Sequence, residues 1–439
     1  MSEYKKVKIG DFLTEREGRY KPDDEKISNY KRLEKIDFSG VIHISDKPSK
    51  TDMIIVHPGD LVISGINVAK GAVAVYQGNE PVCATIHYSS YTFDDKQVDL
   101  EYFKYFVKSD AFISALQKQV KGGIKTEIKP KHLLPLEITI PDLETQKEIV
   151  KKISINLKNV ETLTEEIDSQ KAYAKQLRQN ILQNAMEGKL TAEWRKTHPV
   201  IKGNPDFDAE ALFEETQKEK KSDKKQKELA PISDDEKPFE IPEGWKWVRL
   251  GELADVVRGG SPRPAGDKTY YDGNIPFLKV ADLTGADDKE LYTYTYTIKE
   301  AGLYKTRYVE KETLMLTNSG ATLGIPKICM IPTTFNDGIA AFLGINQRII
   351  KDYLYYLLKS KTQWFLKEAA KGQGQPNLNA DIISATIATL PPLKEQEEIV
   401  RLIEEYISKL IQLEQQISQR EEYANQLMQS ILKDAFEER

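Results

Sequence analysis

Three pairs of polar loops hold the side chains of this sequence that are best suited to binding a ligand through hydrogen bonds. Arg, Lys, Asn and Gln match the hydrogen-bonding edges of bases, and glycine lets backbone approach phosphate. The candidate DNA-contacting residues of the first half are Arg16, Arg19, Tyr20, Lys21, Ser64, Asn67, Lys70, Lys121 and Lys125. Those of the second half are Arg258, Ser261, Arg263, Asn318, Ser319, Thr322, Lys371, Gln373, Gln375 and Asn377. Each residue alone fits an ordinary solvated turn, but three matched loops in each half favour a DNA interface.

Patterns typical of catalysis or metal binding are missing from the sequence. There is no Gly-x-x-x-x-Gly-Lys-Ser/Thr loop for phosphates and no Gly-x-Ser-x-Gly elbow. A nuclease-like pairing of Asp142 with Glu187 fails, because the two lie at opposite ends of one predicted helix. The 2 cysteines and 5 histidines lack the spacing of a zinc site. We therefore predict no catalytic residue, no metal and no cofactor on this chain.

Length and composition indicate a multidomain protein with an ordinary proportion of hydrophobic residues. A chain of 439 residues with 40% hydrophobic residues exceeds one compact core and suits two or three domains. The polar N-terminus predicts no signal peptide, and the two cysteines fit buried thiols in a reducing cytoplasm. The net charge of -5 argues against extensive electrostatic binding of DNA phosphates by this chain alone. Tight DNA binding would therefore need positive charge from partner proteins.

The sequence contains an internal repeat, and this repeat indicates the domain organisation. Residues 143–150 match residues 393–400, and the match continues at the same offset through the following helix. The stretches before these segments also match, more loosely and with shifting offsets. Each half is therefore a globular unit followed by a helix. The helices resemble each other more closely than the globular units do. We therefore expect the two helices to have the same role and the two globular units to have related but different roles.

Residues 142–190 and 392–439 predict long helices with a coiled-coil seam. Apolar residues recur in alternating steps of four and three, which is the coiled-coil period. At 1.5 Å per residue such a helix is roughly 70 Å long, more than one DNA turn of about 34 Å. We expect the two helices to pair within the chain as an antiparallel coiled coil, the alternative being a coiled coil between chains. The predicted seam consists of Ile149, Ile153, Val160, Leu163, Ile167, Leu177, Ile181, Ile399, Ile403, Leu410, Leu413, Ile417, Leu427 and Ile431.

The predicted fold class is α+β with an internal pseudo-twofold repeat. Two mixed globular domains, residues 1–141 and 248–391, alternate with the two spacer helices. Residues 191–247 form the connection and are rich in charge. Their lysine cluster fits either a solvated flexible linker or a DNA-touching patch, and the linker is the simpler interpretation.

The matched segments resemble the specificity subunits of type I restriction-modification systems. Residues 241–252, which contain Pro-Glu-Gly-Trp, resemble the start of a target-recognition domain. Residues 390–400 resemble the beginning of that family's spacer helix, and residues 187–194 the segment after its central helix. The first half lacks the Pro-Glu-Gly-Trp motif, so we place the start of its domain at residue 1 from the internal repeat alone. The resemblance covers essentially the whole chain in the order domain, helix, domain, helix.

The resemblance implies a role in defence against foreign DNA. Such a subunit reads a bipartite, asymmetric DNA target with a fixed gap and has no catalytic centre. It binds two modification subunits, which use S-adenosylmethionine to methylate adenine at N6. Restriction subunits join with ATP and magnesium to translocate and cut DNA. The alternatives are a coiled-coil scaffold that does not bind DNA and a recognition partner in another methylation-based defence system.

Overall fold

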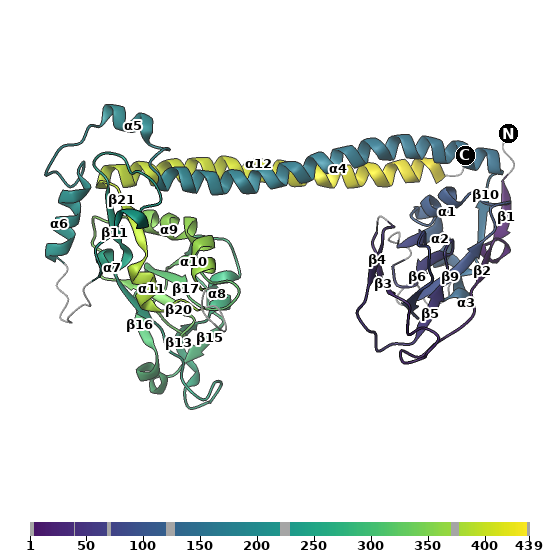
Figure 1. Cartoon of the computed structure of the whole chain (residues 1–439), viewed down its shortest axis with the longest axis horizontal. Helices are drawn as coiled ribbons and strands as arrows, with labels where there is room; N and C mark the ends of the chain where they lie inside the picture. The colour runs from purple at the N-terminus through teal and green to yellow at the C-terminus, as the bar shows by residue number, and fades with distance from the viewer. Residues whose placement is uncertain are drawn as a thin grey trace. The chain divides into compact units, whose positions relative to one another are not determined.

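The computed structural model divides the chain into two compact units. Unit 1 comprises Met1–Gln170 and Gln416–Arg439, and unit 2 comprises Lys171–Gln415. The structure describes residues 4–38, 40–67, 72–119, 128–219, 229–369 and 377–436. Each unit holds one mixed α/β domain together with a part of both long helices (Figure 1). The predicted α+β class with two repeated domains is confirmed.

The two spacer helices are equally long. Helix α4 (Leu143–Met186) and helix α12 (Leu393–Phe436) have 44 residues each. Asp142 caps α4, because its carboxylate accepts a hydrogen bond from the Thr145 backbone N–H at 2.9 Å. Gly188, with φ of 72°, follows the end of α4, in the left-handed conformation that favours glycine. The helix therefore ends at Met186, whereas the sequence had suggested residue 190.

In both units a segment of α4 lies beside a segment of α12 (Figure 1). In unit 1, Arg420 donates a hydrogen bond to Gln170 at 2.9 Å. In unit 2, Arg178 pairs with Glu414 at 2.8 Å, and Thr191 donates to Glu395 at 2.7 Å. As the residue numbers of the α4 side increase from Gln170 to Thr191, those of their partners on α12 decrease from Arg420 to Glu395. The pairing is therefore antiparallel and lies within one chain.

Only one heptad position of the predicted seam is consistently buried. Leu177, Leu413 and Leu427 were predicted in the seam, yet they are exposed by 46%, 42% and 48%. Buried residues at steps of seven are Ile153, Val160, Ile167, Ala174 and Ile181 on α4 and Ile403, Leu410, Ile417 and Ala424 on α12, and the predicted seam residue Ile399 is buried as well.

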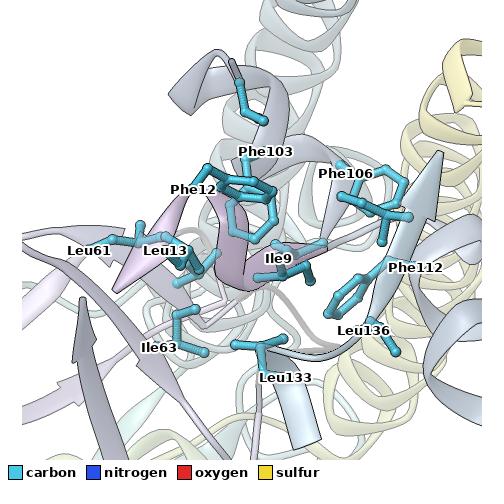
Figure 2. Close-up of a cluster of buried hydrophobic side chains, with 14 of the residues drawn as sticks. Ile9, Phe12, Leu13, Leu61, Ile63, Phe103, Phe106, Phe112, Leu133 and Leu136 are labelled. Carbon is cyan, nitrogen blue, oxygen red and sulfur yellow. The ribbon is translucent and has the colours of Figure 1, made fainter. Parts of the chain in front are cut away.

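The domain of unit 1 is built from three small sheets around an aromatic core. The sheet orders are β1-β10, β2-β9-β6-β7 and β4-β3-β8-β5. Figure 2 shows the core, where Phe12, Phe103 and Phe112 meet aliphatic residues from strands and helices. The strands are β1 (Lys5–Lys8), β2 (Leu13–Glu15), β3 (Arg32–Ile36), β4 (Ile42–Ser45), β5 (Met53–Val56), β6 (Leu61–Ser64), β7 (Val73–Val75), β8 (Val82–Thr85), β9 (Tyr88–Phe93) and β10 (Glu137–Ile140). The helices are α1 (Leu100–Phe106), α2 (Asp110–Gln119) and α3 (Pro130–Leu133), with the 3-10 turn η1 (Ile9–Asp11).

The domain of unit 2 repeats this pairing scheme. Its sheet orders are β11-β21, β12-β20-β17-β18-β14 and β15-β13-β19-β16. The parallel pair β3 with β8 recurs as β13 with β19, within otherwise mainly antiparallel sheets. The strands are β11 (Lys246–Arg249), β12 (Asp255–Arg258), β13 (Tyr271–Leu278), β14 (Glu290–Leu291), β15 (Tyr296–Ile298), β16 (Arg307–Val309), β17 (Thr313–Thr317), β18 (Pro326–Cys329), β19 (Thr333–Phe335), β20 (Ile339–Leu343) and β21 (Ile387–Leu390). The helices are α7 (Leu250–Leu253), α8 (Val280–Thr284), α9 (Lys351–Ser360), α10 (Thr362–Ala369) and α11 (Ala380–Ala385), with the 3-10 turn η4 (Glu300–Lys305).

A buried glutamine joins each domain to the start of its spacer helix. Gln146 donates to the Pro141 carbonyl at 2.8 Å and accepts from the Asp99 N–H at 2.8 Å. Gln396 donates to the Pro391 carbonyl at 2.9 Å and accepts from the Ile350 N–H at 3.0 Å. Because the donating N–H groups belong to Asp99 and Ile350, the residues that directly precede α1 and α9, the same joint is built twice.

Part of the segment predicted as a charged linker is folded onto unit 2. Helices α5 (Ala192–Thr197) and α6 (Ala209–Glu219) lie in it, as does the 3-10 turn η3 (Asp234–Glu236). The buried Glu395 carboxylate of α12 accepts hydrogen bonds from Thr191 and Arg195 at one end of the segment and from Trp245 at the other. Satisfying a buried carboxylate in this way anchors both ends of the segment. Its lysine cluster, residues 220–228, lies outside the described residues.

Candidate nucleic-acid interface

Asp60 fixes the first predicted loop of unit 1, which follows β2. The Arg16 guanidinium donates two hydrogen bonds to this carboxylate, from Nε at 2.9 Å and from Nη2 at 2.9 Å. Asp60 is 1% exposed and also accepts from Ser90 at 2.7 Å and from the His57 N–H at 2.9 Å. Arg16 thus shapes the loop, and the exposed Arg19 is the better placed to meet a ligand.

The first predicted loop of unit 1 lines a groove of about 360 Å³ together with residues 86–90 and 128–131. The Gly65 N–H donates to the His87 carbonyl at 2.9 Å, and the Ile128 N–H donates to the Gly65 carbonyl at 2.8 Å. These bonds bring Gly65 of the second loop next to the residues that line this groove, whereas the third loop, residues 121–125, lies outside the described residues. Tyr20 lies beside the groove, with its backbone paired to Met53 of β5. Ser64, 4% exposed, belongs to the core and not to the surface.

His87, Lys129 and Lys131 also line this groove, and the sequence reasoning missed them. Lysines on both sides of Pro130 were the available signal, because they continue the basic run of the third loop. Glu15 and Glu17 oppose them, and burial raises the pKa of Glu15, the strongest influence on that group. The groove is therefore of mixed charge and does not form a simple phosphate track.

Asp337 organises the first predicted loop of unit 2, which follows β12. Arg258 donates from Nε to the Asp337 carbonyl at 2.6 Å, and Ser261 donates to its carboxylate at 2.7 Å. A Cβ at Gly259 would lie 2.3 Å from the Asn336 carbonyl oxygen, so the loop requires glycine there. Arg263 is exposed at the end of this loop.

The second and third predicted loops of unit 2 meet directly. Ser319 forms an antiparallel bridge with Asn377, and the Leu378 N–H donates to the Asn318 carbonyl at 2.8 Å. Asn318 is 0% exposed, and its side-chain amide has no hydrogen-bond partner within the described part of the chain. Its side chain is therefore not on the surface, whereas Thr322 and Asn377 are exposed.

Six of the predicted DNA-contacting residues lie outside the described residues, and so the structure says nothing of their positions. They belong to the second and third loops of the two units. They are Lys70, Lys121, Lys125, Lys371, Gln373 and Gln375.

A family model decides the relationship of the chain to known proteins. The model for the type I restriction modification DNA specificity domain matches residues 1–170 and 242–422. The chain belongs to this family. The two matched stretches correspond to the two halves of the specificity-domain repeat that the fold displays.

Curated relatives of this specificity protein are distant in sequence. The chain is similar to the type I restriction enzyme EcoEI specificity subunit of Escherichia coli, 29% identical over 55% of this chain and 41% of the relative. It thus spans less than half the length of that relative. It is also similar to the StySPI specificity subunit of Salmonella potsdam, 23% identical over 87% of this chain and 74% of the relative.

A solved structure shares the fold over nearly the full length. It comes from work on complex assembly and conformational transition of the type I R-M system, and it covers 99% of this chain and 97% of its own. The TM-score is 0.62 at 17% identity. In the described ranges, no helix is long and apolar enough to cross a membrane.

Proposed function

We propose that this chain is the DNA-recognition subunit of a type I restriction-modification complex and reads a bipartite, asymmetric target with a fixed gap. The observation that carries the proposal is the repeated convergence of polar loops. In unit 2 the second and third loops meet directly, and in unit 1 the second loop is hydrogen-bonded to residues that line the groove of the first loop. Polar and basic side chains on such loops suit base edges and phosphates.

The two loop sets differ in side chains although their framework is the same. The first loop presents Arg19 and Lys21 in unit 1 but Ser261 and Arg263 in unit 2. Readers with different side chains recognise different base sequences, which makes the complete target asymmetric. The chain supplies recognition only, so methylation and cleavage belong to its partners.

Matched apolar side chains on the spacer helices support docking of two modification subunits. Tyr173 and Leu177 of α4 are 70% and 46% exposed, and their repeat counterparts Tyr423 and Leu427 of α12 are 57% and 48% exposed. The repeat keeps them apolar even though the coiled coil does not bury them, which suits a partner helix. We propose that the partners carry S-adenosylmethionine, ATP and magnesium, and that the complex acts in the cytoplasm.

Selection from a random duplex library tests the proposal. The chain is purified with the adenine methyltransferase encoded beside its gene, and bound duplexes are sequenced. We expect two short conserved blocks at one spacing. A soluble complex that enriches no sequence would contradict DNA recognition and favour the scaffold alternative.

A further inference from the structure

The connection between β15 and β16 of unit 2 brings a second set of side chains to the first predicted loop. Arg307 donates from Nε to the Arg258 carbonyl at 2.7 Å. Lys305 donates from Nζ to the Arg263 carbonyl at 3.0 Å. These two bonds seat the connection directly against the loop that follows β12. Within unit 2, β16 lies on the side of the domain away from α12 (Figure 1).

Lys305 is a cation held in place by aromatic rings. Its ammonium lies 4.2 Å from the centre of the Tyr270 ring and 5.4 Å from that of Tyr304. Hydrogen bonding to the Tyr270 hydroxyl, the largest influence, raises the pKa of Lys305, so the charge persists at neutral pH. A cation whose side chain is already ordered loses little entropy when it binds a phosphate.

Arg307 and its neighbours are open to a large ligand. Tyr304 and Tyr308 are 75% and 53% exposed, and the Arg307 side chain is exposed. Nε of Arg307 is used by the Arg258 carbonyl. Its terminal Nη groups make no hydrogen bond in the part of the chain that the structure describes. An oriented guanidinium beside a fixed ammonium fits the major-groove edge of guanine flanked by phosphate.

The equivalent connection of unit 1 occupies the same place with different chemistry. It joins β4 to β5 over residues 46–52, next to the first loop, because Tyr20 is paired with Met53. It contains Lys47 and Lys50 but no aromatic residue and no arginine. This connection has the same place in both domains but different side chains. It is therefore a place where the two domains would recognise different bases.

We propose that residues 304–308 form a specificity-determining segment for the half-site read by unit 2. Arg307 reads a base edge, and Lys305 holds a neighbouring phosphate. This inference rests on the proposed DNA-recognition function, and it adds a fourth reading segment to the three predicted from the sequence.

The test uses the full chain in complex with its modification subunits and duplexes carrying the target selected by the wild-type complex. We expect Arg307→Ala and Arg307→Lys to weaken binding by about 5- to 150-fold, the range of one bidentate base contact. Discrimination should be lost at one base pair of one half-site and kept at the other half-site. Lys305→Gln should weaken binding to all sequences alike and reduce the salt slope by about one. Lys202→Gln, on the exposed connecting segment, is the matched control and should change neither property.

The outcomes separate this inference from the proposed function. If the wild-type complex selects a split target and all three variants keep its affinity, selectivity and salt slope, this inference alone is wrong. If the wild-type complex selects no DNA, both this inference and the proposed function are wrong. Thermal unfolding is recorded for each variant, and should Arg307→Ala unfold, Arg307→Lys and Lys305→Gln decide the result because they preserve the volume of the side chain.

Discussion

Asp60 illustrates how single residues shape the reading loops. It comes 44 residues after its partner Arg16, and the sequence does not reveal that the two form a bidentate pair. The same holds for Ser64 and Asn318, whose polar side chains suggested surface positions but are buried. Residue type and loop placement indicated candidate loops for DNA contact. They could not predict which side chains point inward, because that depends on contacts distant in sequence.

The Asp60 network gives a prediction for stability. Asp60→Asn leaves the Arg16 guanidinium without its carboxylate and weakens the Ser90 hydrogen bond, and we expect a loss of roughly 1–3 kcal/mol in unfolding free energy. The value stays modest because the side chain of Arg16 is 39% exposed. Urea unfolding measures it, with the exposed Asp46→Asn as the control. Equal midpoints for both variants would show that the network does not stabilise unit 1.

The two cysteines give a prediction about reactivity and pH. Burial is the largest influence on both thiols and raises the pKa of Cys83 and of Cys329. Since the thiolate is the reactive form, a raised pKa lowers its population at pH 8, and burial also blocks reagents. Alkylation of the folded chain at pH 8 should be much slower than that of glutathione and should increase in urea, as mass spectrometry can show. Labelling of the folded chain at the rate of glutathione would contradict this.

At the scale of elements, the repeat predicted the spacer helices well but not the shape of their contact. The period of apolar residues indicated helix and seam, and the helices form as expected. The exposure of Leu177 and Leu427 was not foreseen, because a heptad pattern does not say how many helices share the seam. The internal order of the small sheets lay beyond the sequence too, since many short strands can pair in several ways.

The seam yields a matched pair of substitutions. Ile167 is 1% exposed, and Ile167→Ala should cost about 2–5 kcal/mol of unfolding free energy, as for other buried aliphatic truncations. Leu177→Ala, at a residue that is 46% exposed, should cost less than about 1 kcal/mol. Chemical unfolding followed by circular dichroism compares them. Similar costs at both sites would mean that one helix pair buries both positions in solution.

The exposed pairs on the spacer helices predict the stoichiometry of assembly. We propose that the wild-type chain binds two modification subunits, and replacing Tyr173 and Leu177 together by alanine should leave only one of them bound. The same change at Tyr423 and Leu427 should act equally, because the repeat gives each helix one copy. Mass determination of the purified complexes distinguishes one from two bound subunits. Two bound subunits in both variants would place the docking surface elsewhere.

At the scale of the whole molecule, helix length should set the gap between the two half-sites. Because α4 ends at Met186, an insertion that lengthens the spacer belongs inside the helices and not after residue 186. One heptad added after Gln170 and one after Gln415 keeps the antiparallel register and adds about 10 Å of helix. At about 3.4 Å per base pair, the accepted gap should grow by about three base pairs. An unchanged gap in the selected targets would show that the helices do not act as the ruler.

The most direct test of DNA recognition is to map N6-methyladenine in host DNA. The chain is expressed with the adenine methyltransferase encoded beside its gene, and methylated positions are read by single-molecule sequencing. We expect a split, asymmetric motif with a constant gap that disappears when this chain is omitted. Methylation that is random, or that keeps the same motif without this chain, would contradict its role as the reader of the target.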